Sequence, residues 1–190
     1  MFTTKKNYYL YIDNTKVLDL NLIKKRGKFN IILRNSKKKE EYSKINKFRK
    51  QCSRKGIKFF IANNKRLAIL HKADGLYISS YNKMRLFNSN FSKNMQLIGS
   101  AHNQREIYQK INQGCKSIIL SRVFKTDYIN KIGFLGVVKF NNFIQKNKVI
   151  LVPLGGIRIN NLNKLKMIKT SSLAILSEIK KKPAILNRLF

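Results

Sequence analysis

The run Val149-Ile150-Leu151-Val152-Pro153-Leu154-Gly155-Gly156-Ile157 decides the fold of this 190-residue chain. A short, nearly continuous apolar run predicts a strand that is buried on both faces, as strands of parallel sheets are. Two glycines end the run, and the Asn160-Asn161-Leu162 segment that follows predicts a helix start. Paired glycines at the carboxyl end of a strand let backbone N–H groups approach a ligand closely, and that ligand is usually a phosphate. The alternative is a tight turn that holds no ligand.

Apolar or β-branched runs of strand length recur along the whole chain and alternate with segments of helical spacing. The predicted strands are Tyr8–Ile12, Asn30–Leu33, Lys58–Ile61, Gly75–Ile78, Gln96–Gly99, Ser117–Leu120, Val149–Leu154 and Leu173–Leu176. Between the second and third of these, apolar side chains at steps of three and four share one helix face: Tyr42, Ile45, Phe48 and Cys52. This alternation predicts an α/β fold, a compact (β/α)8 TIM barrel that forms one domain over residues 1–190. The alternative with the same alternation is a doubly wound open sheet.

The chain is strongly basic, with 41 Lys and Arg against 8 Asp and Glu and a formal net charge of +33. The lysines are spread through nearly every predicted element beside abundant Asn and Ile, a mixture that an A+T-rich genome produces through its codons. We therefore predict no specific nucleic-acid partner, only weak, salt-sensitive binding that follows from charge. The absence of a long apolar stretch and of a signal segment predicts a soluble, cytoplasmic protein. Cys52 and Cys115 lack C-x-x-C spacing, which predicts buried thiols in a reducing compartment.

In a barrel, residues that follow the strands build the site. Most residues at these positions are polar or basic, and two are glycines. We select as candidates Arg34, Lys37, Asn63, Asn82, Ser100, His102, Thr126, Gly155, Gly156 and Ser177. This set holds no carboxylate, so it suits a phosphorylated small molecule and offers no good metal site. General acid–base chemistry would fall to His102 or to a lysine, and the alternative for His102 is an ordinary helix-start residue.

Five segments also follow the order and spacing of one protein family. Ala73–Ile78 resembles an A-D-G-V-H-L strand, and Ile98–His102 resembles I-G-x-S-x-H with one residue fewer. Ser121–Thr126 resembles a G/S-P-V-F-x-T loop, Leu154–Ile157 resembles an I-G-G-I turn, and Ala174–Ser177 resembles a final strand with its serine. With these segments the chain resembles the thiamine phosphate synthase/TenI family over nearly its full length.

The resemblance implies an enzyme of thiamine biosynthesis, a transferase that joins a thiazole phosphate to a pyrimidine pyrophosphate and releases pyrophosphate. It implies that Gly155, Gly156 and Ser177 hold the thiazole phosphate and that Thr126 contacts a phosphate. Arg34 matches the arginine that grips the pyrophosphate. The lysine two residues further on is replaced by Ser36, beside Lys37. Stabilisation of the departing pyrophosphate would then fall to Arg34, Lys37 and Lys131.

The chain departs from the family pattern at the positions that bind the family's Mg²⁺. Asn63 and Asn82 stand where the family carries aspartates, and Lys131 is the nearest lysine in the loop that follows Thr126. Arg122 replaces the histidine of the tautomerases. Two amides in place of two carboxylates predict weak Mg²⁺ binding. The alternatives are therefore a TenI-like thiazole tautomerase and a catalytically impaired barrel that binds a phosphorylated ligand; the sequence leaves the oligomeric state open.

Overall fold

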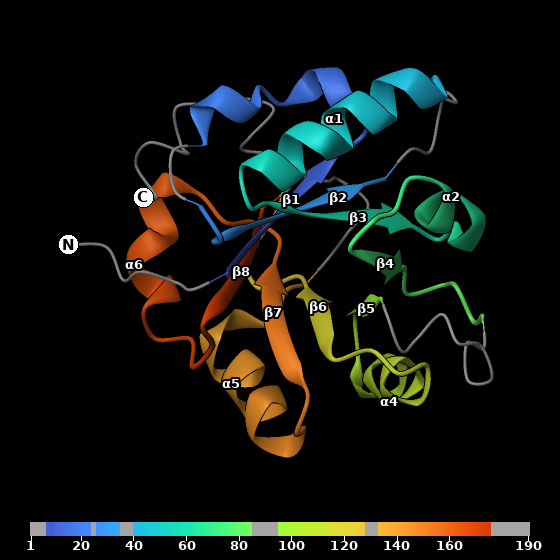
Figure 1. The fold of residues 1–190 in the computed structure, drawn as a ribbon. Helices are drawn as coiled ribbons and strands as arrows, with labels where there is room; N and C mark the ends of the chain where they lie inside the picture. The colour runs from blue at the N-terminus through green and yellow to red at the C-terminus, as the bar shows by residue number, and fades with distance from the viewer. Residues whose placement is uncertain (1–6, 24–25, 35–39, 85–94, 128–132, 176–190) are drawn as a thin grey trace.

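Eight parallel strands form a nearly closed barrel with helices around it (Figure 1). The computed structural model describes residues 7–23, 26–34, 40–84, 95–127 and 133–175. The strands are β1 Asn7–Ile12, β2 Phe29–Leu33, β3 Lys58–Ala62, β4 Gly75–Ile78, β5 Gln96–Ala101, β6 Ser117–Ser121, β7 Ile150–Leu154 and β8 Ser172–Ile175. Hydrogen-bonded neighbours run in the order β7-β6-β5-β4-β3-β2-β1-β8, and β7 contacts β8 across the remaining gap. The predicted barrel is confirmed, and the open sheet is excluded.

The described helices lie outside the strands in Figure 1. They are α1 Tyr42–Arg54, α2 Lys65–Leu70, α4 Gln104–Asn112, α5 Gly136–Lys146 and α6 Leu162–Leu165, with short 3-10 turns η1 Thr15–Val17, η2 Leu20–Leu22 and η3 Ile159–Asn161. Asn64 and Asn103 cap α2 and α4, because each side-chain oxygen accepts a hydrogen bond from the backbone N–H three residues on.

The apolar face of α1 is narrower than its spacing predicts. Ile45, Phe48 and Cys52 are buried, but Tyr42 is half exposed and stacks on His71, with 4.6 Å between ring centroids. Tyr42 is the first residue of α1, and its ring covers His71 at the end of α2 rather than the barrel strands.

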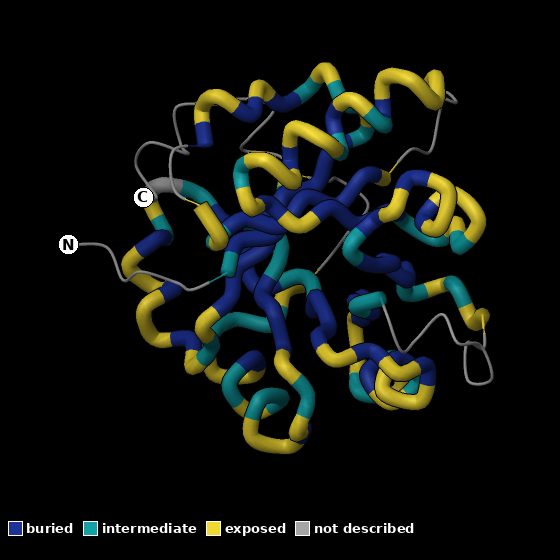
Figure 2. Tube along the Cα trace, viewed as in Figure 1, coloured by how far each residue is buried: buried dark blue, intermediate teal, exposed yellow. Residues whose placement is uncertain are grey.

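Burial divides the core into two layers. The larger layer lies between the strands and the helices, and Figure 2 shows the buried residues gathered on the strands, with exposed residues on the outer helix faces. The smaller layer fills the barrel and consists of Tyr9, Tyr11, Ile32, Phe60, Tyr77, Ile98, Ile119, Val152 and Ala174. Because successive strand residues point to opposite faces, both faces of every strand are buried, as the continuous apolar runs predict.

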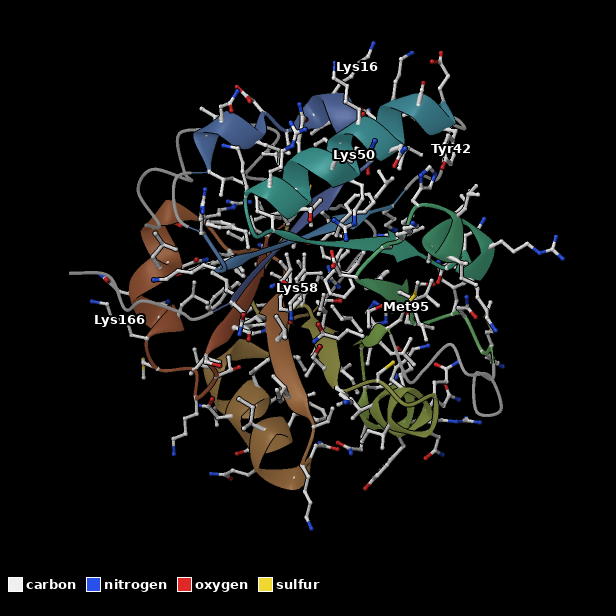
Figure 3. The ribbon with its side chains drawn as sticks, in the orientation of Figure 1. Lys16, Tyr42, Lys50, Lys58, Met95 and Lys166 are labelled. Atoms are coloured by element: carbon white, nitrogen blue, oxygen red, sulfur yellow. The ribbon has the colours of Figure 1, made fainter. Side chains whose placement is uncertain are left out.

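The positive charge is spread over the outside of the molecule. Lys16, Lys50 and Lys166 are exposed, and Figure 3 shows Lys16 and Lys166 projecting at the periphery. The two cysteines are buried free thiols, and burial raises the pKa of each to about 12. Among the described helices, none has both the length and the apolar character of a membrane span.

Candidate functional site

A cavity of about 310 Å³ opens at the carboxyl ends of the strands. Six of the predicted site residues line it: Arg34, Ser100, His102, Thr126, Gly155 and Gly156. Ser100 lies near the end of β5 and the other five follow β2, β5, β6 and β7, so the barrel brings together residues that are far apart in the sequence. Asn63 and Asn82 do not line the cavity but lie beside its wall, and Lys37, Lys131 and Ser177 fall outside the described residues.

The glycine turn after β7 has a conformation that only glycine adopts easily. Gly155 and Gly156 have φ of +97° and +67°, and a Cβ on Gly156 would lie 2.4 Å from the carbonyl oxygen of Lys125. Asn161 holds the turn from the other side, since its side chain donates to the carbonyl of Gly156 at 2.7 Å and accepts from the N–H of Arg158 at 2.9 Å.

The backbone N–H groups of Gly155, Gly156 and Ile157 have no hydrogen-bond acceptor within the described part of the chain. The carbonyls of Leu154 and Gly155, by contrast, accept from the N–H groups of Val123 and Phe124. Consecutive free N–H groups at a cavity wall form an anion-binding concavity. This turn can therefore hold a phosphate.

Arg122 lies against this turn. Its side chain lines the cavity and packs on Gly155, where a Cβ would come within 3.0 Å of the Arg122 Cγ. Its guanidinium donates to the Thr126 hydroxyl at 3.2 Å. Among the described lining residues Arg34 and Arg122 are cationic and none is an aspartate or glutamate, so the cavity favours an anionic ligand.

Two tyrosines from the barrel interior form the floor of the cavity. Tyr11 and Tyr77 meet edge to face with 5.4 Å between ring centroids. The Tyr11 hydroxyl is buried without a hydrogen-bond partner in the described part of the molecule. Burial raises the pKa of Tyr11 well above its ordinary value, with Tyr77 adding to the rise and Arg34 opposing it. The hydroxyl therefore stays protonated at neutral pH.

The loops after β3 and β4 are tied together by amides rather than by carboxylates. The Asn63 side-chain oxygen accepts from the Ser79 N–H at 2.9 Å, from the Ser79 hydroxyl at 3.0 Å and from Asn82 Nδ2 at 3.1 Å. Asn63 Nδ2 donates to the Tyr81 hydroxyl at 3.1 Å. With three donors on one neutral oxygen, no lone pair is left for a cation.

The donor set at this position does not fit Mg²⁺, which wants carboxylate oxygens and near-octahedral geometry. Within the described ranges, no group of three or more His, Cys, Asp and Glu side chains could hold a metal ion.

His102 lines the cavity but is engaged at the start of α4. Its Nδ1 lies 2.9 Å from Glu106 Oε2, and the same carboxylate oxygen accepts from the His102 backbone N–H at 2.8 Å. This is the pattern of a helix-start residue, so the geometry favours the structural interpretation of His102 over a role in proton transfer.

The candidate list from the sequence misses the floor of the cavity. In the sequence, Tyr11 and Tyr77 have the pattern of ordinary core residues. The signal that could have identified the floor is the alternation of Tyr9 and Tyr11, which places polar aromatic groups on one strand face, inside the barrel. Arg122 is noticed as a departure from a family motif, and the structure adds that it shares a wall with Gly155.

Comparisons with known proteins agree with this architecture. A family model described as thiamine monophosphate synthase (TMP-TENI) matches residues 14–179. A thiamine-phosphate synthase of Prochlorococcus marinus is 25% identical over 129 residues, which are 67% of this chain and 37% of that protein. The match thus spans little more than a third of the relative's length.

Two solved structures show the same fold over almost the whole chain. A thiamine phosphate pyrophosphorylase from Pyrococcus furiosus superposes with a TM-score of 0.74 at 16% identity, covering 98% of each chain. KGPDC from Streptococcus mutans superposes with a TM-score of 0.63 at 11% identity, covering 96% of this chain and 94% of that one. At these identities the structural likeness concerns the fold alone, and the family model carries the assignment: the chain belongs to the thiamine monophosphate synthase (TMP-TENI) family.

Proposed function

We propose that the chain is a thiamine phosphate synthase-like transferase that joins a thiazole phosphate to a pyrimidine pyrophosphate. The observation that carries this proposal is the cavity, where Arg34, Arg122 and the N–H groups of Gly155–Ile157 surround one volume; among the described residues these N–H groups have no acceptor and no lining residue is a carboxylate. Both substrates are anionic, and one must lose a highly charged leaving group. A cationic cavity at the strand ends can both bind the anionic substrates and stabilise the departing leaving group.

In the proposed reaction, the bond between the pyrimidine methylene carbon and the pyrophosphate oxygen breaks, and pyrophosphate leaves with the electron pair. The lone pair of the thiazole nitrogen then forms a bond to that methylene carbon and gives a thiazolium. No proton transfer and no redox partner is required. The protein's task is to bind both substrates in line and to stabilise the charge that grows on the leaving group.

Arg34 is the best candidate for the leaving pyrophosphate, because a guanidinium binds phosphate oxygens with two parallel hydrogen bonds. Lys37 and Lys131, which lie outside the described residues, are proposed to add positive charge. The thiazole phosphate is assigned to the turn of Gly155 and Gly156 together with Ser177, since free N–H groups bind phosphate without a charged side chain.

The amide pair Asn63–Asn82 favours a second candidate, a barrel that binds a thiamine-related phosphate without catalysis. Such a protein would keep the anion-binding turn and lose the metal. A TenI-like tautomerase has less support, because Arg122 replaces the histidine of that subgroup and a guanidinium does not act as a base at neutral pH.

A turnover assay with both substrates, run with Mg²⁺ and with a chelator, tests the proposal. We expect activity that resists the chelator and falls about 100-fold in Arg34→Ala, the usual cost of one group that stabilises developing charge. Arg54→Ala removes the same charge at the last turn of α1 and should leave the rate unchanged. Activity that vanishes with the chelator would show that a metal site survives. Tight binding of both substrates without turnover would establish the second candidate.

A further inference from the structure

A buried lysine lies beneath the loop that follows β4. Lys110 belongs to α4, outside the barrel, and is 1% exposed. Its ammonium donates to the backbone carbonyl of Asn82 at 2.8 Å and to the side-chain oxygen of Gln113 at 2.8 Å. Gln113 in turn donates to the carbonyls of Asn82 at 3.0 Å and Met84 at 2.7 Å. Lys110 and its neighbour Gln113 thus hold two carbonyls of one loop.

The stem of Lys110 reaches the loop by crossing β5 at Gly99. A Cβ on Gly99 would lie 2.8 Å from the Lys110 Cγ and 2.9 Å from its Cβ. This is closer than carbon atoms pack, so any side chain at position 99 would displace the lysine stem. Gly99 and Lys110 therefore form a matched pair, in which the missing side chain of one makes room for the other.

The buried position of Lys110 is energetically unfavourable for a charged side chain. Burial lowers the pKa of Lys110 from its ordinary value, while nearby Cys115 and Glu106 oppose the shift. No carboxylate forms a salt bridge with Lys110 among the described residues, so its hydrogen bonds to uncharged oxygens must offset the desolvation. An apolar side chain would fill the space between helix and strand at lower cost. What it could not do is bind the loop carbonyl.

The bound loop builds one wall of the cavity. Ser79, Ser80 and Tyr81 line the cavity, and Asn82 reaches from the same loop to Asn63. We propose that Lys110 is a positioning residue that fixes this wall, because its ammonium binds the loop carbonyl of Asn82 from behind the loop. The claim about the ligand rests on the proposed function, and the claim about the loop does not.

Hydrogen exchange and ligand binding test the two claims separately. In Lys110→Met we expect amide exchange in the 79–84 segment to accelerate at least about tenfold, because two hydrogen bonds to the loop network are lost. The affinity for the pyrimidine pyrophosphate should fall about tenfold, with a smaller change for inorganic pyrophosphate, which does not need the loop wall. Lys116→Met removes an exposed lysine four residues beyond the end of α4 and should change neither quantity.

Gln113→Ala provides a second variant if Lys110→Met folds poorly, and it should give the same pattern more weakly. A double-mutant cycle then tests the pairing. Gly99→Ala should be strongly destabilising with Lys110 present and much less so in a Lys110→Gly background, where the Cβ and the rest of the stem are gone. Exchange in 79–84 equal to that of Lys116→Met would overturn the proposal. Accelerated exchange in a protein whose parent binds neither substrate would retain the loop anchor and refute the proposed function.

Discussion

Replacing both Asn63 and Asn82 with aspartate should create a Mg²⁺ response that we do not expect of the natural chain. In the natural chain, Asn82 Nδ2 donates to Asn63 Oδ1 at 3.1 Å. Two carboxylates at this separation repel by about 5 kcal/mol at an effective dielectric of 20. Both positions are partly exposed and one carboxylate can take up a proton, so we expect a net loss of about 2 kcal/mol in the free energy of unfolding.

For a chain of this size, that loss lowers Tm by about 4–8 °C. A cation between the carboxylates reverses it. At a Mg²⁺ concentration about 100 times Kd, binding to the folded state adds about 2.7 kcal/mol, which is enough to bring Tm back to the natural value or above it.

The assay is thermal unfolding of the natural chain and its variants with Mg²⁺ and with a chelator. Asn63→Asp alone should unfold near the natural Tm, because its carboxylate can accept from the same three donors as the amide does. Asn64→Asp is the matched control, since Asn64 caps α2 one residue away and takes no part in the pair. A natural chain whose Tm rises with Mg²⁺ as much as that of the double variant would refute the reasoning. A double variant without any Mg²⁺ response would refute it equally.

Two further changes test the turn and the floor of the cavity by chemical unfolding. Gly156→Ala should lower the free energy of unfolding by about 2 kcal/mol or more, because its Cβ would meet the carbonyl of Lys125 at 2.4 Å. Gly133→Ala is the control: its φ is +84° and its Cβ would lie in open space, so it should lower the free energy of unfolding only by the backbone strain of about 1 kcal/mol. Tyr11→Phe should raise the free energy of unfolding by about 1 kcal/mol, because it removes a buried hydroxyl without a described partner. Tyr9→Phe, one layer deeper on the same strand, is its control. An equal gain in Tyr9→Phe would contradict this account.

The fold follows from the sequence because barrel strands have an unusually simple pattern. Each is covered by helices on one face and by the barrel interior on the other, so an apolar run such as Ile118–Leu120 has no polar alternation to blur its limits. The predicted strand ends lie within about two residues of those observed, which is the ordinary scatter of strand boundaries. Helix faces are less predictable. Tyr42 shares the spacing of Ile45 and Phe48, yet it is half exposed and stacks on His71.

The sequence predicts the parts of the candidate site that depend on strand order. It does not predict the parts that depend on a long side chain contacting a distant loop. Arg34, Thr126 and Gly155 meet because parallel strands end at one rim, and that follows from topology. The approach of Lys110 to the carbonyl of Asn82 does not, because it joins a helix to a loop 28 residues earlier through the gap at Gly99. No sequence spacing encodes such a contact.

The glycine turn that lines the cavity and the amide pair Asn63–Asn82 beside it differ in what they indicate about a ligand. Gly156 is required by packing alone, since the carbonyls of Phe124 and Lys125 leave no room for a Cβ. Its presence would be explained even if the turn bound nothing. The free N–H groups of the same turn have no such explanation, because packing does not require three neighbouring donors to lack acceptors in the described part of the chain. With Arg122 against the turn and no carboxylate among the described lining residues, these donors support the proposal that the turn binds an anion. Beside the cavity, the side-chain amides of Asn63 and Asn82 hydrogen-bond to each other and need no ion between them. The proposed anion site and the amide pair thus involve different residues, so each can be changed by mutation without changing the other.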